Sequence, residues 1–253
     1  MLSQHFHAFF NAWVFFTRLP APPGVHFSDD HLNRGSRYFS WIGLMLGALL
    51  AGTVLLFNQL LPWSIAVLLM LVFSLLLTGA FHEDGLADLL DGFGGGFDRE
   101  SALSIMKDSR LGTYGASALF MSLVLRWQLL VFLFEAGVSP WLVLPLVHAS
   151  SRFWSISTLW SLPYVSDAVQ AKSKPLATRF GWQASLIAAI PIAASFLLLP
   201  WPMAMLFIIS ALLLRSLLIR WFQRRIQGYT GDALGGAQQL QELLMLTLWL
   251  AWL

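Results

Sequence analysis

The sequence predicts an all-α, polytopic integral membrane protein: a bundle of about six to seven transmembrane helices, preceded by an N-terminal helix that lies at the membrane interface. Of the 253 residues, 57% are hydrophobic and only 11% are charged. A soluble domain of this length would leave part of that apolar surface in contact with water. Apolar runs long enough to cross a bilayer recur along the chain, so residues 1–253 are expected to form a single membrane domain.

The predicted spans are apolar runs of about 17–25 residues, the length that crosses a hydrocarbon core of roughly 30 Å. Residues 5–17 are apolar and aromatic but too short for this, so we expect an interfacial helix that ends before the proline-rich segment 18–24, because proline does not continue a helix. The expected spans are residues 38–57, 62–81, 115–136, 138–162, 183–200, 201–219 and, with a more polar start, 238–253.

Lysine and arginine residues are concentrated in four segments of the chain. Of the 15 lysines and arginines, all but three fall in the N-terminal region or in the segments 82–114, 163–182 and 220–237. The turns between these segments contain none. Because cytoplasmic loops are enriched in Lys and Arg, the four segments are predicted to face the cytoplasm. The formal net charge of +2 does not indicate nucleic-acid binding, and a chain without cysteine has neither disulfides nor thiolate metal sites.

An acidic cluster follows the second predicted span. Seven of the 13 acidic residues fall between positions 83 and 108, and Asp84, Asp88 and Asp91 are spaced so that a helix places them on one face. Carboxylates so close repel one another unless a cation lies among them, and oxygen ligands suit Mg²⁺, which usually also binds substrate phosphates. The cluster indicates a Mg²⁺ site on a helix whose opposite face, with Leu86 and Leu89, is apolar. A solvated acidic loop is the alternative.

Two further polar segments lie on the same predicted side of the membrane. Residues 107–115 follow a short helix for which Asp98 is a suitable N-cap, and they contain two cations and two hydroxyls: Lys107, Arg110, Ser109 and Thr113. Such a loop can bind phosphate through backbone N–H groups and an arginine, or can be a simple re-entry turn. Residues 227–236 place a single carboxylate, Asp232, among glycines.

Three arginines lie inside predicted spans, where a charge is costly and is usually turned into the bundle. Arg215 is near the cytoplasmic end of its span and is expected to extend toward the interface. Arg126 is central, and Arg152 follows His148 on a polar stripe. For these two arginines the sequence leaves two interpretations open, contact with substrate phosphates or bracing of neighbouring helices.

Four motifs, taken together, resemble one family. They are His82-x-Asp84-Gly-Leu-Ala-Asp88-x-x-Asp91-Gly92, Met106-Lys-Asp-Ser-Arg-Leu-Gly112-Thr, Thr230-Gly-Asp232-x-Leu-Gly235 and Phe16-Thr-Arg-Leu-Pro20. In this order they are similar to the cobalamin (5′-phosphate) synthase family, also called adenosylcobinamide-GDP ribazoletransferase, from about residue 13 to the C-terminus. Glu83 stands at a variable position of the first motif, so the resemblance gives it no role.

The resemblance implies a Mg²⁺-dependent phosphotransferase of the bacterial inner membrane with its active site facing the cytoplasm. It would join adenosylcobinamide-GDP to α-ribazole or α-ribazole 5′-phosphate, release GMP and so complete cobalamin assembly. The expected roles are metal binding by Asp84, Asp88 and Asp91, phosphate binding by Lys107 and Arg110, proton transfer by Asp91 or Asp232, and substrate contacts from Ser109, Thr113, Arg152 and Arg18. Whether the protein forms homo-oligomers is left open.

Two other functional classes share some of these features. A CDP-alcohol phosphotransferase of phospholipid synthesis also clusters aspartates at a membrane face, but its signature has arginine after the alanine, where this chain has Asp88. A divalent-cation transporter is expected to have carboxylates within its spans, and we count only Glu135 there, near the outer end.

Overall fold

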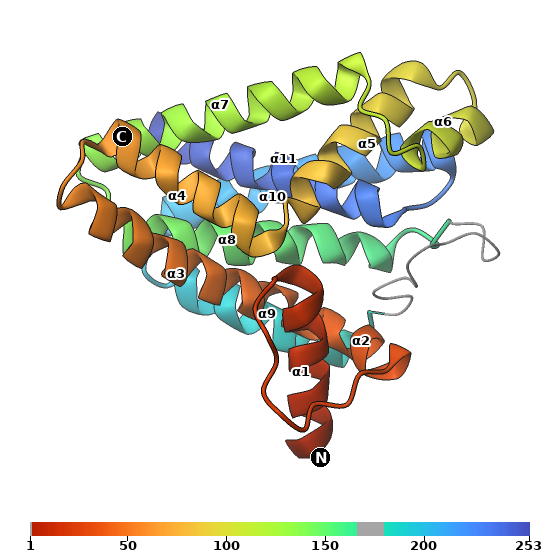
Figure 1. Ribbon diagram of the computed structural model, residues 1–253, viewed down its shortest axis with the longest axis horizontal. Coiled ribbons are helices and arrows are strands. Elements are labelled where there is room, and N and C mark those ends of the chain that lie inside the picture. The colour runs from red at the N-terminus through yellow and green to blue at the C-terminus, as the bar shows by residue number, and fades with distance from the viewer. Residues whose placement is uncertain (1, 166–179) are drawn as a thin grey trace.

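The computed structural model describes residues 2–165 and 180–253, so Lys172, Lys174 and Arg179 lie outside the described residues. Apart from an isolated bridge between Tyr164 and Tyr229, the regular structure of these ranges is helical. The helices are α1 (Leu2–Phe16), α2 (Asp29–Gly35), η1 (Ser36–Tyr38), α3 (Phe39–Asn58), α4 (Trp63–Thr78), α5 (Phe81–Gly95), α6 (Arg99–Met106), α7 (Thr113–Glu135), α8 (Pro140–Ile156), η2 (Ser157–Trp160), α9 (Trp182–Phe196), α10 (Trp201–Ile226) and α11 (Gly231–Trp252), as Figure 1 shows.

The predicted class, an all-α membrane bundle with a short N-terminal helix, is confirmed. By length and hydropathy, three helical stretches in the described part of the chain can cross a membrane, and four can if α4 and α5 count as one span bent by 86°. This is fewer than the six to seven expected from apolar runs. Two of the other helices are short, since α8 has 17 residues and α9 has 15. The third, α11, starts with a polar segment.

The long helices run back and forth along one direction (Figure 1). The connections from α5 to α6 and from α10 to α11 lie at one end of the bundle, and the turns from α3 to α4 and from α7 to α8 lie at the other. The acidic segment thus lies at the same end as the glycine segment around Asp232. This is the arrangement that the distribution of basic residues predicts for a cytoplasmic face.

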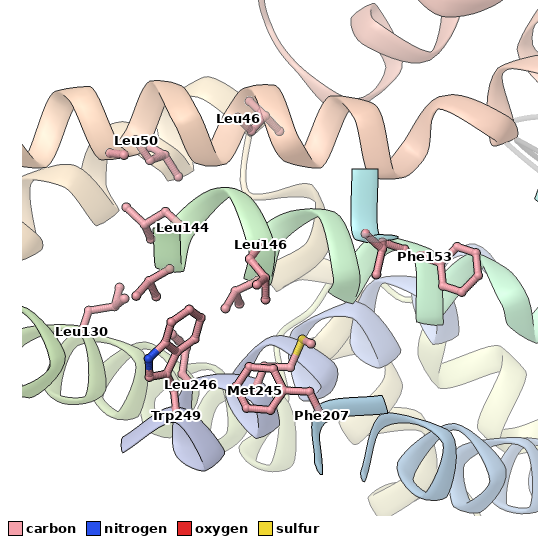
Figure 2. Close-up of a cluster of buried hydrophobic side chains, with 14 of the residues drawn as sticks. Leu46, Leu50, Leu130, Leu144, Leu146, Phe153, Phe207, Met245, Leu246 and Trp249 are labelled. Carbon is pink, nitrogen blue, oxygen red and sulfur yellow. The ribbon is translucent and has the colours of Figure 1, made fainter. Parts of the chain in front are cut away.

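The core lies where α3, α8 and α11 meet. Leu46 and Leu50 of α3 face Leu144 of α8, and Met245 and Trp249 pack on the other side of α8 (Figure 2). Between helices in lipid the gain comes from close packing, because lipid tails are as apolar as leucine, so small residues that let backbones approach are favoured.

Two glycines of α3 allow that approach. A Cβ atom on Gly43 would lie 2.3 Å from the carbonyl oxygen of His148, and one on Gly47 would lie 2.4 Å from that of Leu144. Both obstacles are backbone atoms of α8, which cannot rotate out of the way. The pair α3 and α8 therefore depends on the absence of side chains at these positions.

We expect Gly47→Ala to lower the thermal unfolding midpoint of the protein in detergent by several degrees, because the overpacking costs about 1–3 kcal/mol. Gly52→Ala, on the same helix, is the matched control, since its Cβ would make an ordinary contact of 3.6 Å with Trp141. Both substitutions improve helix propensity equally. Equal midpoints for the two variants would contradict the packing argument.

Candidate functional site

The acidic helix α5 begins at a sharp corner. Helix α4 ends at Thr78. Gly79 follows with a left-handed φ of 67°, and Ala80 with a φ of 56°. These two residues produce the 86° bend between α4 and α5. Arg18 lies at this corner: its backbone N–H donates to the carbonyl of Leu77 at 2.8 Å, and its guanidinium packs against Gly79. The motif around Arg18 therefore supports the start of the acidic helix.

The predicted faces of α5 are confirmed. Leu86 and Leu89 are buried on the apolar face, and Asp84 is exposed while Asp88 is half-buried. Gly94 and Gly95 remain part of helix α5. Arg225 completes its C-terminus by donating to the carbonyls of Phe93 at 2.8 Å and Gly96 at 2.6 Å.

The third polar segment meets this helix. Helix α11 begins after Thr230, whose hydroxyl accepts from the N–H of Ala233, and Asp232 is in its first turn. A Cβ atom on Gly85 would lie 3.0 Å from the carbonyl oxygen of Asp232 and 3.2 Å from the Cα of Gly235. Asp84 and Asp88 of α5 are thereby brought to the first turn of α11, although they are far from Asp232 in sequence.

The carboxyl groups of Asp88 and Asp232 both have raised pKa values. Burial raises the pKa of Asp88 to about 7, and the charges of Asp232, Asp84 and Asp91 add to the effect. Burial and the charge of Asp84 raise the pKa of Asp232 to about 6. Asp88 and Asp232 both lie in segments that are predicted to be cytoplasmic, outside the membrane-spanning stretches. A pKa raised by like charges marks a place where a cation would be bound favourably.

Asp91 has a different environment from Asp84 and Asp88. Its side chain is 7% exposed, and its two oxygens accept from the backbone N–H groups of Gly112 at 2.7 Å and Gly115 at 2.8 Å. These donors belong to the unsatisfied first turn of α7, where a negative charge is also favourable. A Cβ on Gly115 would lie 2.3 Å from the carboxylate. Asp91 thus fastens the start of α7 and the loop before it to α5.

The loop before α7, residues 107–112, is the candidate phosphate-binding segment. Asp108 accepts from the Arg110 guanidinium at 2.5–3.0 Å, and these hydrogen bonds lower the pKa of Asp108. The Arg110 side chain remains 87% exposed, and Ser109 and Thr113 are exposed beside it. Lys107 follows α6, where the predicted cap is confirmed, because Asp98 and Ser101 form a reciprocal capping box. The predicted phosphate ligands therefore share one surface segment.

For Arg126 the structure favours bracing of helices over contact with substrate. Its side chain is buried, with Nη1 3.1 Å from Oε1 of Glu83 and Nε 3.0 Å from Oε1 of Glu242, so it links α7 to α5 and α11. Arg152 is also buried and donates to the ring nitrogen and the carbonyl of His148. It lies within the bundle, so we do not include it among the substrate ligands proposed below.

Sequence reasoning missed Glu83 and Glu242. The count that placed only Glu135 inside a span was wrong, because Glu242 lies in the last predicted span and is 2% exposed. The signal was present in the polar run 238–242, which interrupts an otherwise apolar helix. A buried polar run in a membrane helix usually pairs with other polar groups in the bundle.

A separate cavity of about 490 Å³ lies between α2 and the start of α9. Arg34, Arg37 and Trp182 are among its lining residues, and none of the predicted site residues lines it. Both arginines belong to the N-terminal group of basic residues that indicates topology.

The donor set determines which metal would fit. Among the described residues, no three His, Cys, Asp or Glu side chains are grouped closely enough to hold a metal ion by themselves. Asp84, Asp88 and Asp232 nevertheless offer oxygen donors only, and Mg²⁺ is typically held by one or two carboxylates together with substrate phosphates. The residues present therefore fit Mg²⁺ shared with a phosphate ligand, with Asp84 and Asp88 as the residues that would hold it and Asp232 beside them.

These features define a class: a helical membrane protein with a carboxylate cluster and a cationic loop at one end of its bundle. The chain belongs to the cobalamin-5-phosphate synthase family, whose model matches residues 8–250. It is 42% identical to the adenosylcobinamide-GDP ribazoletransferase of Vibrio cholerae over 255 residues, covering 100% of this chain and 97% of the relative.

Two further relatives have the same name. That of Shewanella pealeana is 45% identical over 260 residues, covering 99% of this chain and 98% of the relative. That of Ralstonia pickettii is 43% identical over 253 residues, covering 100% and 98%. No solved structure matches the chain. The four sequence motifs therefore identified the family correctly.

We expect Asp91→Ala to release the start of α7. Loss of a helix N-cap costs about 0.5–2 kcal/mol, and the amides of residues 107–118 should exchange with deuterium faster, as hydrogen-exchange mass spectrometry can measure. Asp84→Ala is the matched control, because Asp84 is exposed on the same helix. Unchanged exchange in Asp91→Ala would show that the carboxylate does not fasten this loop.

The raised pKa of Asp88 predicts a pH dependence of stability. The group titrates near 7 in the folded protein and near 3.8 when unperturbed, so the folded state holds a proton that the unfolded chain has lost. Without divalent cations, the free energy of unfolding should fall as the pH rises from about 4 to about 8. Asp88→Asn should reduce this slope in thermal unfolding with a chelator, and Glu100→Gln, at an exposed site, should not. A wild-type slope of the opposite sign would contradict the assignment.

Proposed function

We propose that this protein transfers the cobinamide phosphate of adenosylcobinamide-GDP to α-ribazole or its 5′-phosphate, releasing GMP. The observation that carries the proposal is the meeting of Asp84 and Asp88 with Asp232 beside a cationic loop, in a chain that matches the family over residues 8–250. The names of the relatives support the donor and the acceptor. The family match over residues 8–250 favours this transferase over a lipid phosphotransferase or a cation transporter.

The reaction joins a hydroxyl of the ribazole to the phosphorus next to the cobinamide. A new P–O bond forms, the P–O bond to GMP breaks, GMP leaves with the bonding electron pair, and the hydroxyl proton is lost. Such transfers depend mainly on positioning and on neutralising negative charge. Arg110, which is exposed on its loop, would bind the phosphate of the leaving GMP, together with Lys107, Ser109 and Thr113 of the same segment.

Asp232 is the better candidate to accept the hydroxyl proton. Its pKa of about 6 is close to the pH of the cytoplasm, which suits a general base. Both oxygens of Asp91 already accept backbone hydrogen bonds, so Asp91 holds the loop in place. This division assigns the two aspartates different tasks.

Asp84 and Asp88 would hold Mg²⁺, which would neutralise charge at the diphosphate and leave Asp232 free to accept the proton. The predicted topology places these residues at the cytoplasmic face of a bacterial inner membrane, where a soluble nucleotide-activated substrate has access. The distribution of lysine and arginine supports this orientation.

The proposal predicts that protein in lipid vesicles releases GMP from adenosylcobinamide-GDP only when α-ribazole 5′-phosphate and Mg²⁺ are both present. Asp88→Asn should reduce the rate by on the order of 100-fold or more, since the metal-assisted stabilisation is worth several kcal/mol. Glu100→Gln removes an exposed carboxylate of α6 and should retain activity. Release of CMP from a lipid donor, with no GMP from the corrinoid donor, would overturn the assignment.

A further inference from the structure

A network of buried charges lies within the bundle, next to the carboxylate site but apart from it. Four charged side chains are each less than 7% exposed, namely Glu83, Arg126, Arg152 and Glu242. Two are negative and two are positive, so their charges balance. They come from α5, α7, α8 and α11, and the substrate chemistry proposed above uses none of them.

Arg126 is the centre of this network. It pairs with Glu83 of α5 at 3.1 Å and with Glu242 of α11 at 3.0 Å, and it also donates to Gln239. Gln239 in turn donates to Glu83 at 3.3 Å, so Glu83 is held from both α7 and α11. The far side of the network reaches α8, where His148 lies 3.6 Å from Glu242.

The network is attached to the site through two helices. Glu83 immediately precedes Asp84, and in a helix neighbouring side chains are about 100° apart, so fixing the direction of Glu83 also fixes that of Asp84. On α11, Gln239 lies seven residues after Asp232 and hence on the same face. The hydrogen bond between Gln239 and Glu83 lies next to the close contact of Gly85 with Gly235, two residues from Glu83 and four from Gln239. Asp84 and Asp232 belong to the same two stretches of helix.

We propose that Glu83, through Arg126 and Gln239, is a positioning residue that fixes the rotation of α5 and so sets the spacing of Asp84 and Asp88 relative to Asp232. A rotation of α5 by about 20° would move a carboxylate roughly 6 Å from the helix axis by about 2 Å. Metal and phosphate binding do not tolerate a displacement of this size. The glycine contact between α5 and α11 permits close approach but provides no side chain that resists rotation.

The test titrates Mn²⁺ at a fixed concentration of GDP, which supplies the phosphates, and follows the electron paramagnetic resonance signal of the free ion against a protein-free control, so that it does not depend on turnover. This proposal rests on the proposed function, because it assumes a cation site at Asp84 and Asp88 beside Asp232. We expect Glu83→Gln to weaken Mn²⁺ binding about tenfold, as is typical when the support of a metal ligand is lost. His148→Gln, a buried change in the same network on a helix without site carboxylates, should bind within about twofold of wild type.

Arg126→Lys is the second variant, in case Glu83→Gln does not fold. It keeps the buried charges balanced but cannot reach Glu83, Gln239 and Glu242 together, so it should also weaken binding about tenfold. Normal Mn²⁺ binding by either folded variant would overturn the positioning role while leaving the proposed function intact. Failure of wild type to bind Mn²⁺, or binding by Asp88→Asn as tight as by wild type, would overturn the cation site and this inference together.

Discussion

The close approach of α5 to α11 is the contact on which the site depends. At Gly85 and Gly235 the two helices come so near that a methyl group on either glycine would press against the backbone of the other helix. This brings Asp84 and Asp88 to Asp232, and the neighbouring charges add to the effect of burial, which raises the pKa of Asp88 to about 7. Like charges at such a place cost stability, and a bound cation would offset that cost. The arrangement is typical of a site that exchanges stability for binding.

The three aspartates of the first motif share a helix but not a task. Helical spacing correctly places Asp84, Asp88 and Asp91 on the same side of α5, yet Asp91 is directed at the first turn of α7. Spacing along one helix fixes only the direction of a side chain, and the neighbouring element decides what it meets there. The Lys107–Gly112 loop is consequently held beside the carboxylates by an aspartate that the sequence alone would assign to a metal.

Much of the fold follows from the sequence. Apolar runs predicted most helices, and Asp98 correctly marked the start of α6. The four motifs gave the family and the polar segments of the candidate site. The sequence did not predict the pairing of Glu83 with Arg126 or of Arg126 with Glu242, because these residues are 43 positions or more apart and only tertiary packing brings them together. Glu83 stands at a variable position of the first motif, so the resemblance gives it no role, and only the structure shows that it is buried and paired.

The buried network also explains why hydropathy does not identify α11 as a span. The polar residues of α11, Gln238, Gln239, Gln241 and Glu242, are at most 2% exposed, and His148 and Arg152 of α8 are buried against them. Hydropathy averaged along a helix counts these groups as if they met lipid, whereas they meet one another. The outer surface of the bundle remains apolar, with exposed leucines such as Leu76 and Leu213. A helix that turns its charges inward can therefore cross a membrane at a lower cost than its composition indicates, provided that each charge has its partner in place.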